Sequence, residues 1–387
     1  MIVRRLILRQ FRNIRSADLA FGPGTVIFYG ENGAGKTNLI EAIALLALGK
    51  SFRAARDAAW RMWGTRETLL RAEVETARGR ETLELRLVGE EKTARADGLP
   101  VPRLADFVGR LGIVLFVPDD VELVGGPPAV RRRFFDLELS QRWPRYLYHL
   151  SRYHKILLQR NRLLKSNGDP ATLGRLLEAY DPLLAESAAP IVRARARFVD
   201  HLRPHAEAAY RALAGGREAL RLEYVSGSGL AGASLAGEEA ALRAALLKRF
   251  EAGRATDVRR RQTLTGPHRD DLTIALDGHP AEGHASQGQR RSIALALKLA
   301  AARVAEAWTG EAPVVLLDDV LSELDERRQR AFLTLLGEQG QAFLTVADRR
   351  GLEALRPRAQ LFSVTAGAVR PIPPGGAADG HGQEERG

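Results

Sequence analysis

The chain has 387 residues, 45% of them hydrophobic, and a formal net charge of +11. That length allows a large core and two or three lobes, and the charge favours an anionic partner such as nucleic acid over a merely soluble, arginine-rich surface. The absence of cysteine excludes disulfides, thiolate zinc sites and cysteine nucleophiles. The lack of cysteine fits a cytoplasmic protein, which we expect. No uncharged run approaches the ~20 residues of a membrane helix, and we expect no membrane partner.

The first predicted elements surround a glycine-rich loop. Residues 1–8 are typical of a strand, and their apolar stretch is too short for a signal peptide. Residues 25–29 form an apolar run of β-branched and aromatic side chains, which predicts a buried strand. Apolar residues then recur at helical spacing from 39 to 47. Between this strand and this helix lies the pattern G-x-x-x-x-G-K-T, at residues 30–37.

Each residue type in this pattern suits the binding of a nucleoside triphosphate. Glycines permit a tight turn that aims backbone N–H groups at phosphate oxygens, and a helix N-terminus attracts the same anion. Lys36 is expected to reach the β- and γ-phosphates, and the Thr37 hydroxyl to coordinate Mg²⁺. The strand and helix on either side disfavour an accidental turn. The loop residues assigned to the site are Gly30, Glu31, Asn32, Gly33, Ala34, Gly35, Lys36 and Thr37.

The next elements are predicted to be hairpins, followed by a helical region. Residues 69–75 and 82–88 read as strands joined at Arg78-Gly79, with a second turn at Asp97-Gly98 and a buried strand over 113–117. From about 128 to 255 the pattern is helical. An apolar stripe is formed by Leu147, Leu150, Leu157 and Leu164. Prolines interrupt this region, so we expect several short helices there. The prolines are Pro170, Pro182, Pro190 and Pro204.

An apolar strand at residues 314–317 ends in two carboxylates, Asp318 and Asp319. Beside a phosphate loop, the first is expected to hold Mg²⁺ and the second to orient or deprotonate an attacking water. Lys36 and Asp319 are thus the catalytic candidates, and Thr37 and Asp318 the metal ligands. The alternative is an ordinary strand followed by an acidic helix cap, which the upstream loop makes less favourable.

The segment Ser286-Gln287-Gly288-Gln289 opens a predicted helix over residues 290–308. Ser286 can cap this helix, and the helix dipole favours an anion at the same end. On physical grounds alone, an ordinary cap is the favoured interpretation of this segment.

The order of these motifs resembles that of the ABC-type ATPases. Their residues resemble the motifs of the RecF family of bacterial recombination mediators. The resemblance spans about residues 3 to 350. The strings Gly266-Pro267-His268-Arg269-Asp270-Asp271 and 318–325, Asp-Asp-Val-Leu-Ser-Glu-Leu-Asp, are its most specific parts, joined by Phe11-Arg12-Asn13-Ile14, Ser51-Phe52-Arg53 and residues 116–120.

The resemblance implies an α/β fold, an ABC-type P-loop ATPase head with a mixed β-sheet core, a helical second lobe and no long coiled coil. The order of the predicted elements indicates a core from 1–125 and 261–370 that is split by a helical lobe at 126–260. Residues 371–387 are rich in Gly, Pro and polar residues, which predicts a disordered tail. ATP is the implied nucleotide, and Arg12 and Asn38 join its site. Ser286, Gln287, Gly288 and Gln289 are implied to contact the γ-phosphate held by another subunit.

The implied function is ATP-dependent DNA binding in recombination, repair, replication-fork maintenance and the SOS response. An ATP-dependent homodimer would act on single- and double-stranded DNA at gaps, with RecR and RecO as partners, to promote RecA loading. Weak, DNA-stimulated ATP hydrolysis would release it. Asp319 stands where ABC-type enzymes usually carry Glu, which suggests slow hydrolysis. Neither a glutamine in residues 117–122 nor a histidine after residues 343–346 is found, so those two roles stay unassigned.

Basic clusters at 131–133, 152–165, 193–197 and 259–261 are candidates for DNA contact. Phosphate contact needs charge but reads no sequence, and no zinc finger or helix-turn-helix pattern is found, so binding should be sequence-independent. Each single cluster could equally be a solvated face or an internal ion pair. The DNA-binding candidates are Arg131, Arg132, Arg152, Lys155 and Arg260.

Three other interpretations stay open. The chain could be an ABC-type subunit driving a membrane transporter, or a DNA-binding scaffold in which nucleotide is only structural. A phosphoryl transferase lacks any acceptor-site pattern. His268 could act as a base, but a structural role in its turn is favoured.

Overall fold

The computed structural model describes residues 1–54, 56–216, 218–232, 235, 237–337, 340–347 and 359–373, without the side chain of Glu323. The chain divides into two compact units. Unit 1 comprises Met1–Phe107, Leu111–Pro118 and Glu311–Gly387, and unit 2 comprises Val108–Arg110 and Asp119–Gly310.

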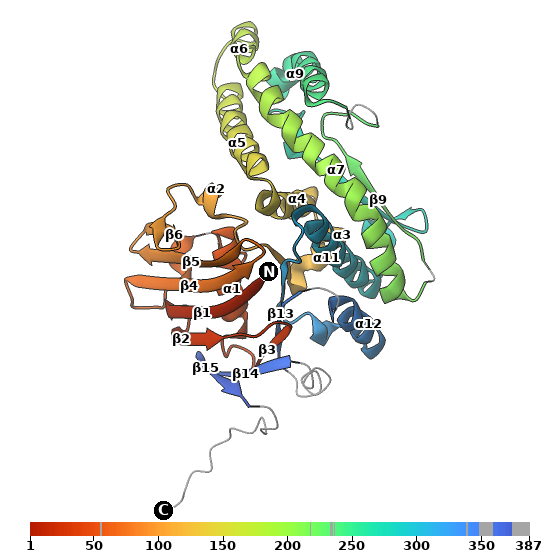
Figure 1. Ribbon diagram of the computed structural model, residues 1–387. Coiled ribbons are helices and arrows are strands. Elements are labelled where there is room, and N and C mark those ends of the chain that lie inside the picture. The colour runs from red at the N-terminus through yellow and green to blue at the C-terminus, as the bar shows by residue number, and fades with distance from the viewer. Residues whose placement is uncertain are drawn as a thin grey trace, which may run out of the picture. The chain divides into compact units, whose positions relative to one another are not determined.

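Unit 1 contains an antiparallel sheet in the order β2-β1-β4-β5-β6-β7 (Figure 1). Its strands alternate buried apolar and exposed polar residues, as expected for a sheet with one covered face. The predicted hairpin is confirmed, since β4 pairs with β5 along its whole length. The bounds are β1 Ile2–Phe11, β2 Ile14–Ala20, β4 Glu67–Thr76, β5 Gly79–Val88, β6 Glu91–Ala96 and β7 Leu99–Pro100.

The second sheet of unit 1 joins strands that are far apart in the sequence, in the order β15-β14-β3-β13-β12-β8. Its strands from β14 to β8 are parallel, and only β15 is antiparallel. One sheet is thus assembled from strands near both ends of the chain. The bounds are β3 Thr25–Tyr29, β8 Ile113–Phe116, β12 Val314–Leu317, β13 Ala342–Val346, β14 Ala359–Thr365 and β15 Ala368–Ile372.

Helix α1, Lys36–Leu48, packs against β4 and β5 of the first sheet and against β13 of the second. It is buried on all sides, which explains why its apolar residues, such as Ile40 and Leu46, do not follow a single stripe. In the described part of unit 1, the other helical elements are η1 Asp57–Trp60, α2 Leu104–Phe107, η4 Leu321–Glu323 and α12 Glu326–Gly337. Element η2, Pro118–Val121, begins at Pro118, the last residue of the segment Leu111–Pro118 of unit 1.

Unit 2 is mainly helical, with a small sheet in the order β11-β10-β9. Helix α7 packs against α5, α9 and α11 and against β9. The helices are α3 Glu122–Gly125, α4 Pro128–Arg142, α5 Pro144–Leu164, α6 Pro170–Leu177, α7 Tyr180–Ala214, α9 Glu239–Arg260, α10 Ala281–His284, α11 Gln287–Thr309 and η3 Pro267–Arg269. The strands are β9 Leu220–Val225, β10 Asp271–Leu276 and β11 His279–Pro280.

The expectation of several short helices is wrong for α7, which runs for 35 residues with Pro190 and Pro204 inside it. Pro182 lies in its first turn, where the missing N–H has no helical acceptor anyway. The two internal prolines each remove one helical hydrogen bond. That loss is outweighed because side chains such as Leu184 and Phe198 are fully buried against neighbouring elements.

A buried arginine of unit 2 pairs with residues of two other long helices. Arg160 of α5 pairs with Asp181 of α7 at 3.2 Å and with Asp257 of α9 at 2.7 Å. Its guanidinium also donates to the Thr263 hydroxyl at 2.8 Å. All three charged side chains are at most 1% exposed. Arg160 lies in the basic cluster at 152–165 that the sequence proposed for DNA contact; the structure places it in the interior.

The extent of the tail and the predicted domain boundaries stay predictions. Within the described residues, Pro371 pairs with Phe362 at the end of β15, and residues 374–387 lie outside them. The helix that carries Ser286 at its start, α11, belongs to unit 2 and packs against α7.

Replacing Arg160 with methionine should strongly destabilise unit 2, because Asp257 would lose its positive partner and Asp181 would keep only Arg254. The expected loss is about 3–5 kcal/mol in the free energy of unfolding, measured by urea denaturation. The control is Arg152→Met, which breaks a pair with Glu186 in which both side chains are about a third exposed; it should cost less than about 1 kcal/mol. Equal losses in the two variants would contradict the structural role of Arg160.

Candidate nucleotide-binding site

The carboxyl end of β12 meets the first turn of α1 at one edge of the parallel sheet. The Thr37 hydroxyl donates to Asp318 Oδ1 at 2.8 Å, across a sequence separation of 281 residues. Lys36 Nζ donates to the carbonyl oxygens of Gly30, at 2.7 Å, and Glu31, at 2.9 Å. The end of the glycine-rich loop and the acidic end of β12, two motifs predicted separately, therefore lie together.

The glycine-rich loop needs its glycines at specific points. Gly33 and Gly35 have φ angles of +80° and +118°, in the region that side chains disfavour. A Cβ at Gly35 would lie 2.8 Å from Asn13 Oδ1, and one at Gly30 would lie 2.2 Å from the Val364 carbonyl oxygen. The loop can therefore take this shape only with glycine at these positions, and its exposed residues, Glu31 to Gly33, border solvent.

Thr345 on β13 is a site residue that the sequence reasoning missed. Its hydroxyl donates to Asp318 Oδ1 at 3.1 Å and accepts from the Asp319 backbone N–H at 2.8 Å. The side chain is buried, and β13 lies between β12 and β3. A threonine in the otherwise apolar strand 342–346 was the available signal, because a buried hydroxyl requires a hydrogen-bond partner.

Arg12 lies beside the site but is committed to a carboxylate of α1. Its guanidinium makes a two-pronged ion pair with Glu41, which is fully buried and also accepts from the Ser51 hydroxyl. The neighbouring Asn13 donates to the Ala34 carbonyl oxygen and accepts from the Asn38 amide. The turn after β1 thus holds both the phosphate loop and the helix that follows it.

Burial opposes charge on the two most important side chains. It lowers the pKa of Lys36, although nearby Asp319 and Asp318 act in the other direction. Burial raises the pKa of Asp318, against the hydrogen bonds from Thr37 and Thr345 that favour the carboxylate. A bound anion and cation would each relieve one of these costs.

The Ser286 segment forms an ordinary helix cap, as its chemistry predicts. The Ser286 hydroxyl accepts from the Gln289 backbone N–H at 3.2 Å, and the Gln289 side chain accepts from the Ser286 N–H at 2.6 Å, a complete capping box at the start of α11. The Gln289 amide also donates to Glu218. Ser286 and Gln287 are exposed, and Gly288 follows in the first turn.

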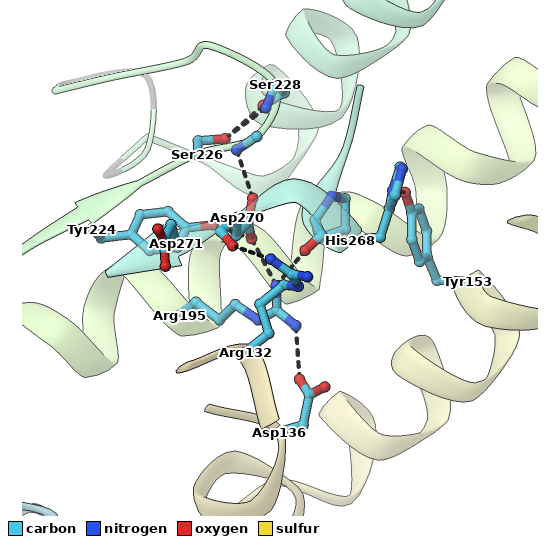
Figure 2. Close-up of polar contacts among 12 residues, drawn as sticks. Arg132, Asp136, Tyr153, Arg195, Tyr224, Ser226, Ser228, His268, Asp270 and Asp271 are labelled. Atoms are coloured by element: carbon cyan, nitrogen blue, oxygen red, sulfur yellow. Dashed lines mark hydrogen bonds and ion pairs between the residues drawn. The ribbon is translucent and has the colours of Figure 1, made fainter. Parts of the chain in front are cut away.

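Within the string from Gly266 to Asp271, Asp270 is the centre of a buried polar network in unit 2 (Figure 2). Asp270 is fully buried; it accepts from Arg195, at 2.8 Å, from the Tyr224 hydroxyl and from the Gly227 N–H. Arg195 also pairs with Asp136, at 2.7 Å. Burial raises the pKa of Asp270, and Arg195 opposes that shift. This string therefore holds β9, β10, α4 and α7 together.

His268 has two buried partners. Nε2 lies 3.0 Å from the Thr263 carbonyl oxygen and therefore carries the proton, so Nδ1 accepts from the Tyr153 hydroxyl at 2.6 Å. Burial lowers the pKa of His268 to about 4. These contacts favour the structural role over that of a general base.

The basic candidates differ in what their side chains contact. Arg131 is buried, and its guanidinium pairs with Asp271 at 2.6 Å, so we remove it from the DNA-contact candidates. Arg132 is half-buried and donates to the Asp270 carbonyl oxygen, and Arg152 pairs with Glu186. Lys155 and Arg260 are exposed. The most buried of these candidates, Arg131, therefore forms an internal ion pair and is not part of a solvated face.

The comparisons with known proteins agree with this arrangement. The sequence model described as RecF/RecN/SMC N terminal domain matches residues 2–368. A DNA replication and repair protein RecF of Symbiobacterium thermophilum is 42% identical over 373 residues, which cover 95% of this chain and 98% of that protein. The chain belongs to the RecF family. A second RecF protein, of Shouchella clausii, is 39% identical over 96% of this chain and 99% of its own length.

Solved structures give the same family. A structure described as the recombination mediator protein RecF-ATPrS in the RecFOR pathway has a TM-score of 0.86 and 30% identity, over 96% of this chain and 98% of that one. A RecF-ATP structure of the same pathway has a TM-score of 0.84 and 30% identity, over 96% and 97% of the two chains. A structure that contains an Smc head, 14% identical with a TM-score of 0.55 over 96% and 97%, shares the fold.

These matches confirm the predicted ABC-type fold and family, and they do not support the transporter alternative. In the part of the chain that the structure describes, no helix combines the length and the apolar character that a membrane span requires. The assignments of individual site residues stay predictions.

Asp318→Asn should stabilise the nucleotide-free protein, because an amide oxygen can accept from Thr37 and Thr345 without a buried charge. The midpoint of thermal unfolding should rise by roughly 1–3 °C, while the thermal shift caused by added ATP and Mg²⁺ should shrink. Asp319→Asn is the matched control: it removes the same charge from a half-buried position and should move the unliganded midpoint less. A lower midpoint for Asp318→Asn would contradict the burial argument.

His268 should make stability depend on pH. Its folded pKa of about 4 lies below the ordinary histidine value of 6.5. The unfolded state therefore binds the proton first, and stability is lost as pH falls from about 6.5 to 4, by about 3 kcal/mol at most. Urea denaturation at pH 7 and pH 4.5 tests this in wild type and in His268→Gln, whose amide can keep one polar contact. Buried acids with a raised pKa, such as Asp270, have the opposite effect on stability as pH falls, but they are present in both proteins. The difference between the two proteins therefore reports on His268, and an identical pH response would overturn the prediction.

Proposed function

We propose that this chain is an ATP-switched, DNA-binding protein of recombinational repair and replication-fork maintenance. The observation that carries the proposal is the hydrogen bond from Thr37 to Asp318, which assembles the phosphate loop and the acidic strand end into one preorganised site. Membership of the RecF family supports the proposal, since its relatives are described as DNA replication and repair proteins and one solved relative as RecF-ATP.

The residues of the site fit ATP and Mg²⁺. The loop from Gly30 to Gly35 would present backbone N–H groups to phosphate oxygens, and Lys36 would exchange its two carbonyl partners for phosphate. Thr37 and Asp318 offer two converging oxygen ligands, and Mg²⁺ in such sites takes its other ligands from phosphate and water. Bound Mg²⁺ neutralises phosphate charge and orients the terminal phosphate.

Asp319 would orient or deprotonate the attacking water. Its backbone is held by Thr345, so the carboxylate has a defined starting position at the end of β12. The shorter side chain of Asp, compared with Glu, reaches less far, and we therefore propose weak hydrolysis, stimulated by DNA. A steady-state turnover of tens per second would contradict this part of the proposal.

Dimerisation would complete each site. Two subunits would join head to tail, and the segment from Ser286 to Gln289 of one would close the loop held by the other. The exposure of Ser286, at the N-terminus of a 23-residue helix, supports this role, because the hydroxyl and the helix end both suit an anion. Hydrolysis would reopen the dimer.

DNA would bind through phosphate contacts, on single and double strands and independently of sequence. Exposed Lys155 and Arg260 remain the strongest of the original candidates, with Arg132 and Arg152 secondary because both contact acceptors in unit 2. RecR and RecO are the proposed partners in promoting RecA loading, supported by the description of the solved relative as a mediator in the RecFOR pathway.

Sedimentation of wild type, Lys36→Ala and Ser286→Arg, with and without ATP, Mg²⁺ and DNA, tests the switch. ATP should dimerise wild type and neither variant, because the first variant lacks the phosphate ligand and the second blocks the partner's site with a bulky side chain. Ser166→Arg, at an exposed serine after α5 and away from the residues assigned to the site, checks that a new arginine alone does not prevent assembly.

Two outcomes would reject the switch. An ATP-independent dimer of wild type would show that nucleotide does not control assembly. If Lys36→Ala or Asp319→Asn dimerised and cycled normally on DNA, the nucleotide would be structural and the chain a DNA-binding scaffold.

A further inference from the structure

Trp63 is the most exposed large apolar side chain in the described part of the chain. Its side chain is 99% exposed, whereas Trp60, three residues earlier, is fully buried. Tryptophan supplies more contact area than any other side chain and is enriched where surfaces meet a partner. Two tryptophans in one short segment thus differ fully in exposure, and the exposure of Trp63 needs an explanation.

The backbone presents Trp63 on a rigid turn. The Thr65 N–H donates to the Met62 carbonyl oxygen at 3.2 Å, and the Thr65 hydroxyl donates to the same oxygen at 2.8 Å. Gly64 has φ +78°, as the third residue of a type II turn requires. Trp63 is therefore the second residue of a preorganised turn, so a partner would meet it with little conformational entropy left to lose.

The same turn is hydrogen-bonded to the segment that holds the phosphate loop. The Met62 N–H donates to the Gln10 carbonyl oxygen, and the Arg12 N–H donates to the Trp60 carbonyl oxygen, both at 2.8 Å. Arg12 in turn pairs with Glu41 of α1. Trp63 thus stands on a backbone that is connected, through one strand end, to the nucleotide site of unit 1.

The surroundings of Trp63 are basic. Residues 56–66 contain three arginines and one acid, Asp57, whose carboxylate is paired with Lys92 at 2.6 Å. The Arg61 guanidinium donates to the Arg66 carbonyl oxygen at 3.3 Å, which places both arginines at the base of the turn. An exposed aromatic face between arginines matches single-stranded nucleic acid, where bases stack on aromatic rings and cations follow the backbone.

We propose that Trp63 stacks on an unpaired base of DNA, with Arg61 and Arg66 beside the backbone phosphates. The occupant is single-stranded DNA, or the unpaired bases that adjoin a duplex end, because bases inside a duplex offer no free face to an indole. This site deepens the proposed function and rests on it. It also makes unit 1, and not only the helical unit 2, a DNA-binding surface.

Affinity for an oligonucleotide of single-stranded DNA, measured by fluorescence anisotropy with ATP and Mg²⁺ over a range of salt, tests the proposal. Trp63→Ala should weaken binding roughly 5- to 100-fold, whereas Trp63→Phe should retain most of the affinity. The slope against salt should stay unchanged, because no phosphate contact is removed. Leu99→Ala is the control, as it truncates another exposed apolar side chain (70%) of unit 1, on strand β7, and should leave affinity unchanged.

Intrinsic fluorescence gives a second readout. Trp60 is buried, and Trp143 and Trp308 are half-buried and stacked on each other at 4.8 Å, so quenching by acrylamide reports mainly on Trp63. Single-stranded DNA should protect Trp63 from acrylamide. A DNA duplex whose two ends are closed by loops too short for their bases to unstack should protect Trp63 less.

The outcomes separate this inference from the function on which it rests. If wild type binds no DNA at any salt concentration, the proposed function fails. If wild type binds DNA while Trp63→Ala binds equally well and quenching is unaffected, only this inference is overturned. Equal losses on closed duplex and single strands, or loss of ATP-dependent dimerisation in Trp63→Ala without DNA, would also overturn it, by pointing to a groove contact or a protein contact.

Discussion

Parallel pairing of β3, β13 and β12 is the constraint on which the candidate site depends. The three strands come from residues 25–29, 342–346 and 314–317, and their carboxyl ends must meet at one edge before Lys36, Thr37 and Asp318 can approach. Thr345 then links the strands by bonding to both acids at the end of β12. A one-residue slip would turn Asp318 to the opposite face of the sheet, so register and chemistry are set together.

The sequence predicted the elements of this core well, since buried strands and the loop have strong local patterns. The segments at 25–29, 113–116 and 314–317 are strands, and the loop occupies the expected turn. The positions of Thr345, Glu41 and Asn13 could not be predicted, because each acts through a partner that is distant in the sequence. Only the assembled sheet shows that a threonine on β13 faces the acids of β12.

Proline and arginine gave the least reliable predictions, for a shared physical reason. Local propensity treats Pro190 as a helix end and Arg160 as a surface residue, yet both lie inside unit 2's packed helices. Tertiary burial outweighs the lost hydrogen bond of the proline, and two carboxylates compensate the buried guanidinium. A basic run in the sequence therefore does not distinguish an internal ion pair, such as that of Arg195, from a surface for DNA.

The backbone gives a reason for the identity of the second acid. Asp319 has φ +52°, in the left-handed region that is costly for most side chains but tolerated by Asp and Asn. Its N–H is held there by the Thr345 hydroxyl, which also bonds to Asp318. Glutamate, which ABC-type enzymes usually carry at this position, would reach further but would add strain to this conformation. The short acid is thus the residue that this strand end accommodates, because the backbone there also positions Asp318.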